Sequence, residues 1–363
     1  LIISTLHATV SASHDSSTAA GDAMASGTGA AKHIPGRAVR AIFSDLDGTL
    51  VHFSQWFERH GVRIVTPADE TLAAPKAVVA DPAGEERICR VLPKSTMGLG
   101  YVSERTVELV DALREDGVRF VVITAARKST LLERLELLPT CDVAVGECGT
   151  RIYYDGKLDM DWASRFEAVS GPLETDVPPE DRPQPLWRLC ARMREAGLKV
   201  DTRSYFGCFR VDTQGSEEQA ALVERFRAEM HASIACTMNL AKYDFYPAVC
   251  GKGNAVRYLQ GKYDLRPEEC AALFDDDNDL PMAAECCHRF LPALTSDSIV
   301  AAVKANPTWR VAKRCGQGVF AVEELLEFIL AGGSETQGDT GDVASGQNGE
   351  GSETPVGMVG PPQ

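Results

Sequence analysis

Short apolar runs alternate with amphipathic helical segments along most of this chain, and this alternation restricts the fold more than any other feature. The runs VRAIFSDL, VRFVVIT and CDVAVGE, which start at Val39, Val118 and Cys141, are almost continuously apolar, as strands buried on both faces are. The segments SERTVELVDALRED and STLLERLELL place apolar residues on one helical face, with Ser103 positioned to cap the first and Pro139 to end the second. The pattern predicts an α/β fold, with a parallel sheet that is covered by helices on both faces.

Two long segments interrupt this alternation. Residues 54–102 form an insertion after the first strand, with a hairpin predicted around Asp81-Pro82-Ala83-Gly84. Residues 157–247 hold two helices and several strands, and we expect them to form an inserted α+β cap domain. The predicted core therefore consists of residues 37–156 and 248–331, with 54–102 as a candidate second flap.

The two ends of the chain have compositions typical of disordered segments. Residues 1–36 are rich in Ser, Ala, Thr and Gly, and residues 332–363 are rich in Gly, Ser and Thr. The N-terminal segment is also a candidate remnant of a targeting peptide.

Composition argues against several classes of function. The formal net charge is −15, whereas a nucleic-acid partner requires a basic surface. No apolar run approaches the ~20 residues of a membrane-spanning helix. The eleven cysteines lack zinc-ligand spacing, which predicts reduced thiols in a cytoplasmic or organellar compartment rather than a secreted protein. The expected partner is a small molecule, and the oligomeric state stays open.

Acidic residues stand at the ends of two predicted strands. Asp45 and Asp47 follow the first strand in AIFSDLDGTL, and the run 275–279 follows the strand of ALFDDDNDLPM. Because ligands bind at the carboxyl ends of parallel strands, the two groups can meet on one divalent cation such as Mg²⁺. A calcium loop does not fit, since Leu280 and Cys286 stand where it needs Gly and Glu. A solvated acidic turn is the other alternative.

Two more residues indicate a binding site only in combination with these acids. Lys252 lies between two glycines, where a phosphate could approach it closely, although a Gly-Lys-Gly stretch is more often a plain turn. Thr124 ends the second strand and could equally be a core hydroxyl or a ligand.

In chain order, the stretch Asp45-Leu46-Asp47-Gly48-Thr49-Leu50, then Thr124, Lys252 and the run 275–279, resembles the four motifs of the haloacid dehalogenase-like superfamily. The similarity covers about residues 40–330. It looks closest to the sucrose-phosphatase-like and related sugar-phosphate phosphatases, which CDVAVGECGTRIYYDGKL and YDFYPAVCGKGNAVRYL resemble. This resemblance implies a Rossmann-like core with a large α/β cap between the second and third motifs.

The resemblance also implies roles for individual residues. Asp45 matches the nucleophile that forms an aspartyl-phosphate, and Asp47 matches the general acid and base. The matching phosphate-binding residues are Thr124, Lys252 and Asn278, and the matching Mg²⁺ ligands are Asp45, Asp47 through its backbone carbonyl, Asp275 and Asp279.

The chain departs from the family pattern at two of these positions. Phe274 and Asp276 flank the fourth-motif aspartate where Gly and a small residue are usual, which leaves Asp276 as an alternative to Asp275. Alignment on Arg127 would move the hydroxyl position from Thr124 to Ala125, but the spacing from the preceding helix favours Thr124.

Substrate contacts are expected in the cap. Its cationic, aromatic and amide side chains suit a phosphorylated sugar, although any single one of them is more often an ordinary solvated strand residue: Arg203, Tyr205, Phe206, Arg210, Asn239 and Lys242. Together the residues predict a Mg²⁺-dependent phosphatase that acts on a small phosphorylated metabolite, with a sugar phosphate as the leading candidate. The alternatives are a phosphotransferase or phosphomutase of the same superfamily, and a catalytically idle relative that only binds a ligand.

Overall fold

The computed structural model describes residues 38–95, 97–239 and 242–333, so the predictions for the two ends of the chain lie outside the described residues. An eight-stranded sheet forms the core. Six neighbouring strands run parallel, namely β8, β7, β1, β15, β16 and β17, whereas β9 pairs antiparallel with β8 and β10 pairs antiparallel with β9. In spatial order the strands are β10 (Lys157–Leu158), β9 (Arg151–Tyr154), β8 (Val143–Gly146), β7 (Arg119–Ile123), β1 (Ala41–Ser44), β15 (Cys270–Leu273), β16 (His288–Leu291) and β17 (Arg310–Val311).

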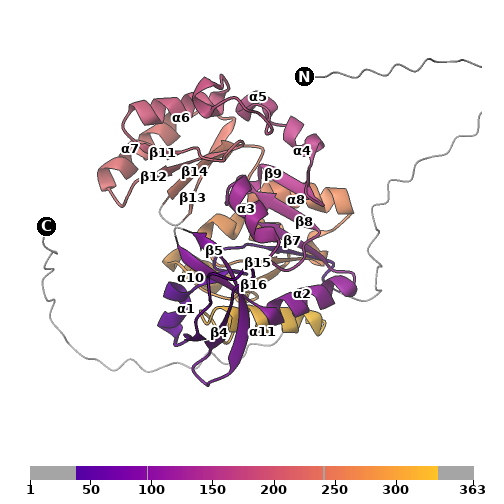
Figure 1. Ribbon diagram of the computed structural model, residues 1–363. Coiled ribbons are helices and arrows are strands. Elements are labelled where there is room, and N and C mark those ends of the chain that lie inside the picture. The colour runs from indigo at the N-terminus through magenta and orange to yellow at the C-terminus, as the bar shows by residue number, and fades with distance from the viewer. Residues whose placement is uncertain (1–37, 96, 240–241, 334–363) are drawn as a thin grey trace, which may run out of the picture.

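Helices cover both faces of this sheet, which confirms the predicted fold class (Figure 1). Neighbouring residues of β1 point to opposite faces: Ile42 packs with α2 and α11, and Phe43 packs with α8, α9 and α10. The covering helices are α2 (Glu104–Glu115), α3 (Lys128–Leu135), α8 (Lys252–Tyr263), α9 (Leu280–Ala284), α10 (Asp297–Ala305) and α11 (Val319–Leu330). Ser103 caps α2 as predicted, since its side chain accepts a hydrogen bond from the backbone N–H of Thr106.

The insertion after β1 folds into a second, five-stranded antiparallel sheet. The predicted hairpin is present, because β4 pairs with β5 and the turn is closed by a hydrogen bond from Asp81 N–H to the Glu85 carbonyl. In spatial order the strands are β2 (His52–Phe53), β6 (Gly98–Ser103), β5 (Glu86–Ser95), β4 (Lys76–Ala80) and β3 (Arg63–Thr66), accompanied by α1 (Ser54–Phe57) and the 3₁₀ turn η1 (Glu58–His60).

The cap is a four-stranded antiparallel sheet with α6 (Pro185–Glu195) and α7 (Glu217–Glu229) packed against it (Figure 1). Its strands, in spatial order, are β11 (Lys199–Asp201), β12 (Phe209–Asp212), β14 (Lys242–Pro247) and β13 (Ile234–Asn239). Two short helices, α4 (Met160–Ser164) and α5 (Glu167–Ser170), link it to the core. Since β10 still pairs with β9, the core sheet reaches Leu158, just past residue 157 where we place the start of the cap.

Two findings bear on the compositional predictions. All eleven cysteines have free thiols. Within the described ranges, the helices are too short or too polar to cross a bilayer.

Candidate functional site

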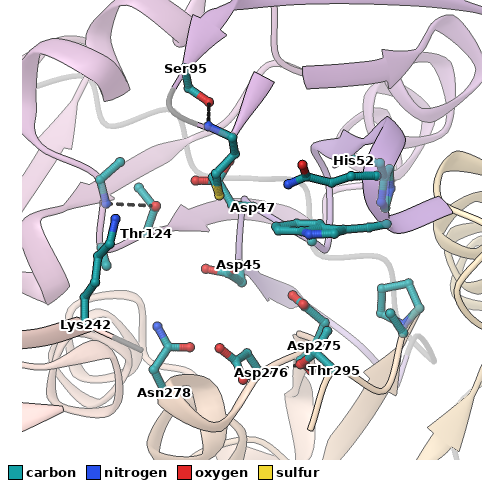
Figure 2. Close-up of a pocket in the computed structure, with 18 of the residues that line it drawn as sticks. Asp45, Asp47, His52, Ser95, Thr124, Lys242, Asp275, Asp276, Asn278 and Thr295 are labelled. Carbon is teal, nitrogen blue, oxygen red and sulfur yellow. Dashed lines mark hydrogen bonds between the residues drawn. The ribbon is translucent and has the colours of Figure 1, made fainter. Parts of the chain in front are cut away.

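Three buried carboxylates meet at the carboxyl ends of β1 and β15. Asp45 directly follows β1, Asp275 lies just beyond β15, and Asp279 ends the 3₁₀ turn η5 (Asp277–Asp279). One oxygen from each lies within 4.8 Å of the others, and all three side chains are buried. Figure 2 shows Asp45 and Asp275 facing the same space. Adjacent parallel strands therefore bring together acids that are 230 residues apart, as predicted from their strand-end positions.

Lys252, the first residue of α8, is the cation of this cluster. Its Nζ lies 2.5 Å from an oxygen of Asp45 and 2.5 Å from an oxygen of Asp279. Although burial lowers the pKa of Lys252, the charges of Asp279 and Asp45 raise it overall, so the side chain stays a cation. The buried ammonium thus balances only part of the negative charge around it.

The surplus of negative charge is visible in the pKa values of the carboxyl groups. Burial, with the charge of Asp45, raises the pKa of Asp279 to about 7, against the opposing effect of Lys252. Burial raises the pKa of Asp45 in the same way. The pKa of Asp275 lies well above its usual range because of burial and the charges of Asp45 and Asp279. Each carboxylate would be stabilised by more positive charge than Lys252 supplies.

The donor set fits a hard divalent cation. Asp279 Oδ2 is buried and has no hydrogen-bond partner among the described residues. All the converging atoms are carboxylate oxygens, the ligands that Mg²⁺ and similar ions prefer. Among the described residues, this is the group of acidic, His or Cys side chains close enough to hold a metal ion.

The loop after β1 is shaped around Asp275. Thr49 donates a hydrogen bond to Asp275 Oδ1 at 2.7 Å, which orients this carboxylate. Gly48 has a φ of 104°, and a Cβ at this position would collide with the Asp275 carboxylate. The glycine of the motif is therefore required both for its backbone conformation and for the close approach of Asp275.

Asp47 is not a member of the group of three clustered carboxylates, and it pairs with Arg134. The Arg134 Nη1 lies 2.7 Å from Asp47 Oδ1, and the Arg134 side chain is buried. Arg134 belongs to α3, which packs beside the loop after β1, and nothing in its local sequence indicates this contact. The side chain of Asp47 is thus separate from the predicted metal-binding group.

The two alternatives for the fourth motif lie in different surroundings. Asp275 belongs to the carboxylate cluster, whereas Asp276 caps η5 by accepting a hydrogen bond from Asp277 N–H at 2.8 Å. Asn278 is buried and lines the same cleft. Thr124 directly follows β7 and lines the cleft, and its hydroxyl oxygen accepts a hydrogen bond from Ala126 N–H at 3.1 Å.

These residues line a large cleft of about 1490 Å³ that the core, the cap and the insertion enclose together. Figure 2 shows Lys242 from the cap, Ser95 from the insertion and Asn278 from the core around Asp45. The insertion contributes wall residues that its sequence did not single out: Trp56, Arg59, His60, Lys94, Ser95 and Met97.

The predicted cap residues differ in what holds them. Arg210 makes two hydrogen bonds to Asp244, at 2.6 and 2.7 Å, and Arg203 pairs with Asp201 at 3.1 Å. Tyr205 is buried with the Arg127 guanidinium 5.0 Å from its ring centre. The predicted residues that line the cleft are Arg203, Tyr205, Arg210 and Lys242.

One of the other two predicted cap residues does not contribute to this wall. Phe206 lies outside the lining of the cleft, and its backbone N–H donates a hydrogen bond to Glu147. Asn239 ends β13, and its side chain lies outside the described part of the chain.

Comparison with known proteins gives one family and several similar folds. Residues 101–289, just over half of the chain, match the family model described as sucrose-6F-phosphate phosphohydrolase. Among curated proteins there is no significant match. The crystal structure of Thermoplasma acidophilum 0175 has a TM-score of 0.52 and 13% identity, covering 80% of this chain and 98% of that chain. The sucrose-phosphatase from Synechocystis, solved with sucrose and phosphate, has a TM-score of 0.49 and 15% identity, with the same coverages.

Proposed function

Since this chain belongs to the sucrose-6F-phosphate phosphohydrolase family and is a phosphatase, we propose that it uses Mg²⁺ and an aspartyl-phosphate on Asp45 to hydrolyse a small phosphorylated metabolite. A phosphorylated sugar is the proposed substrate class. The family confirms the resemblance to sucrose-phosphatase-like proteins that the motifs indicate. The observation that carries the proposal is the convergence of Asp45, Asp275, Asp279 and Lys252 at one sheet edge, open to a large cleft.

The proposed first step is an in-line attack on the phosphorus atom. A carboxylate oxygen of Asp45 forms the new P–O bond while the bond to the leaving oxygen breaks. The Asp47 carboxyl group gives its proton to the leaving oxygen, so that the product departs as an alcohol. Thr124 and Asn278, which line the cleft beside Asp45, are proposed to bind the phosphoryl oxygens.

The second step returns the enzyme to its starting state. Asp47, now a carboxylate, takes a proton from a water molecule that attacks the aspartyl-phosphate, and inorganic phosphate leaves. The contact between Asp47 and Arg134 holds this carboxylate at the edge of the site until it turns toward the reacting group.

Charge compensation is what these carboxylates need to accept a phosphate dianion. Asp45, Asp275, Asp279 and the backbone carbonyl of Asp47 would hold Mg²⁺, which when bound supplies charge neutralisation between phosphate and carboxylates. Lys252 adds a fixed positive charge on the Asp45 and Asp279 side.

The test is phosphate release from an aryl phosphate and from a panel of sugar phosphates, with Mg²⁺ and with EDTA. We expect activity only with the metal, and a loss of at least ~10³-fold in Asp45→Asn and in Asp47→Asn while both variants remain folded. Full activity in either variant would contradict the mechanism. Release that requires an added alcohol acceptor would favour the phosphotransferase alternative.

A further inference from the structure

The cleft has an uneven distribution of charge. Apart from the aspartates at the ends of β1 and β15, every charged side chain that lines it is basic. This is unusual for a chain whose formal net charge is −15. A cationic wall inside an acidic protein attracts anions to this cleft.

Four of these basic side chains already have carboxylate partners. Arg134 pairs with Asp47, Arg127 and Arg203 pair with Asp201, and Arg210 pairs with Asp244. These four guanidinium groups share three carboxylates, so most of their positive charge is already compensated.

Three basic side chains that line the cleft have no carboxylate partner among the described residues. In the described ranges of the chain, no carboxylate lies within ion-pair distance of Arg59, Lys94 or Lys242. They come from three separate elements: Arg59 from η1, Lys94 from β5 and Lys242 from the first position of β14. Figure 2 shows the Lys242 side chain pointing into the cleft on the side of Thr124 and Asn278.

Two of the three belong to the insertion, which forms the wall next to Asp47. Ser95, which follows Lys94 at the end of β5, lies on the same side of the cleft as Asp47 in Figure 2. Asp47 is the residue proposed to protonate the leaving oxygen, and Lys94 lines the same cleft as Asp47. Trp56 adds a flat apolar surface there, fixed by an edge-on contact with Phe53 at 4.9 Å between ring centres.

From this arrangement we infer that the substrate is a phosphate ester whose leaving group carries an anionic group of its own, either a second phosphate or a carboxylate. Arg59, Lys94 and Lys242 bind this second group, while the first phosphate occupies the site at Asp45. The inference rests on the proposed function and specifies its substrate class. It also gives the insertion a role, since neither the core nor the cap supplies Arg59 and Lys94.

The test compares three substrates that share a hexose 6-phosphate end. Glucose 6-phosphate has a neutral leaving group, glucose 1,6-bisphosphate adds a phosphate, and 6-phosphogluconate adds a carboxylate. We expect kcat/KM to be at least ~10-fold higher for one or both of the anionic substrates, mainly through a lower KM. The preference should weaken as salt is added, because the three cations are partly exposed to solvent.

Variants assign the preference to the named residues. Arg59→Gln, Lys94→Gln and Lys242→Gln should each reduce the ratio of kcat/KM between anionic and neutral substrates by ~3- to 10-fold. Arg63→Gln is the matched control, since Arg63 is an exposed arginine of the same insertion, in β3, that does not line the cleft. It should keep the wild-type ratio.

The outcomes separate this inference from the function on which it rests. If the wild type releases phosphate from an aryl phosphate in an Asp45-dependent way but prefers glucose 6-phosphate, the inference is overturned and the function stands. If the preference exists but survives all three substitutions, the assignment to these residues is wrong. Absence of phosphate release from every substrate would overturn both.

Discussion

Gly48 offers the sharpest test of the site at the scale of one residue. Its positive φ makes any L-residue costly, and an added Cβ would overlap the Asp275 carboxylate. We expect Gly48→Ala to lose ~2–5 kcal/mol of unfolding free energy, and phosphate release to fall by at least ~100-fold because Asp275 is displaced. Denaturant unfolding and phosphate release measure the two effects.

A second glycine separates the backbone cost from the collision. Gly84, in the turn between β4 and β5, has a φ of 88° and open space where its Cβ would be. Gly84→Ala should lose only the ~1–2 kcal/mol of a left-handed backbone and retain wild-type activity. Equal stability losses in the two variants, with activity kept in both, would show that the contact between Gly48 and Asp275 is not needed.

His52 gives the folded state a specific pH dependence. It lies buried in β2, and its Nε2 has no hydrogen-bond partner among the described residues. Burial lowers its pKa to about 3. The unfolded chain, with an ordinary pKa near ~6.5, binds a proton there first as the pH falls, so His52 reduces stability increasingly below about pH 6.5.

Substitution isolates this contribution from that of the carboxyl groups. Between about pH 7.5 and about pH 5, the unfolding free energy of His52→Asn should gain about 2 kcal/mol relative to that of the wild type. Urea unfolding of both proteins at the two pH values measures the change. A difference that stays constant with pH would mean that the buried imidazole takes up its proton over the same pH range in the folded protein as in the unfolded chain.

At the scale of elements, one buried carboxylate is a central point of contact between the insertion and the core. Glu323 of α11 accepts hydrogen bonds from Ser103, at 2.5 Å, and from Arg87 of β5, at 2.7 Å. Ser103 is also the cap of α2, so a helix start, a strand of the insertion and α11 meet at one point. Phe320 extends the contact by packing in the apolar core of the insertion. The wall that carries Lys94 is therefore held in a fixed position relative to the catalytic edge of the sheet.

The strand ends explain why much of the site could be predicted from the sequence. Asp45, Thr124 and Asp275 follow apolar runs, and a parallel sheet brings the ends of such runs to one edge whatever lies between them. The hairpin at Asp81 was equally readable, because both strands and the turn are local.

Contacts that depend on packing could not be predicted in this way. The pairing of Arg134 with Asp47 depends on where α3 rests against the loop after β1, and Arg134 looks like any helical arginine in the sequence. The same holds for the wall formed by the insertion. Its outer strand β2 pairs with β6, which lies almost 50 residues further on, and this pairing places Arg59 and Lys94 in the cleft. A local sequence pattern indicates neither which strand β2 pairs with nor how close α3 lies to the loop after β1.

At the scale of the whole molecule, one contact between the cap and the core is centred on a buried carboxylate. The buried Glu147, next to β8, accepts hydrogen bonds from the backbone N–H groups of Phe206 and Gly207 in the cap, both at 2.8 Å, and forms an ion pair with Arg151 at 3.0 Å. Gly207 presses against the core so closely that a Cβ there would collide with the Thr150 side chain. At Gly207 the cap therefore contacts the core through its backbone, with no room for a side chain at that position.

Gly207→Ala should move the cap away from the catalytic edge. The added methyl group must displace Thr150 or separate the two N–H groups from Glu147, and either change shifts the cap residues Tyr205 and Lys242 that line the cleft. We expect KM for the best sugar phosphate to rise by ~10-fold or more, with a smaller change for an aryl phosphate that makes fewer contacts with the cap. Steady-state kinetics with both substrates, and small-angle scattering for the cap position, provide the measurement.

Gly261→Ala is the control for this substitution. Gly261 lies in α8 with open space around its Cβ position, so alanine should keep both KM values and, as a better helix former, stabilise the protein by ~0.5–1 kcal/mol. If Gly207→Ala behaves like this control, the cap tolerates displacement at its contact with Thr150, and substrate binding does not depend on the close packing of Gly207 against the core.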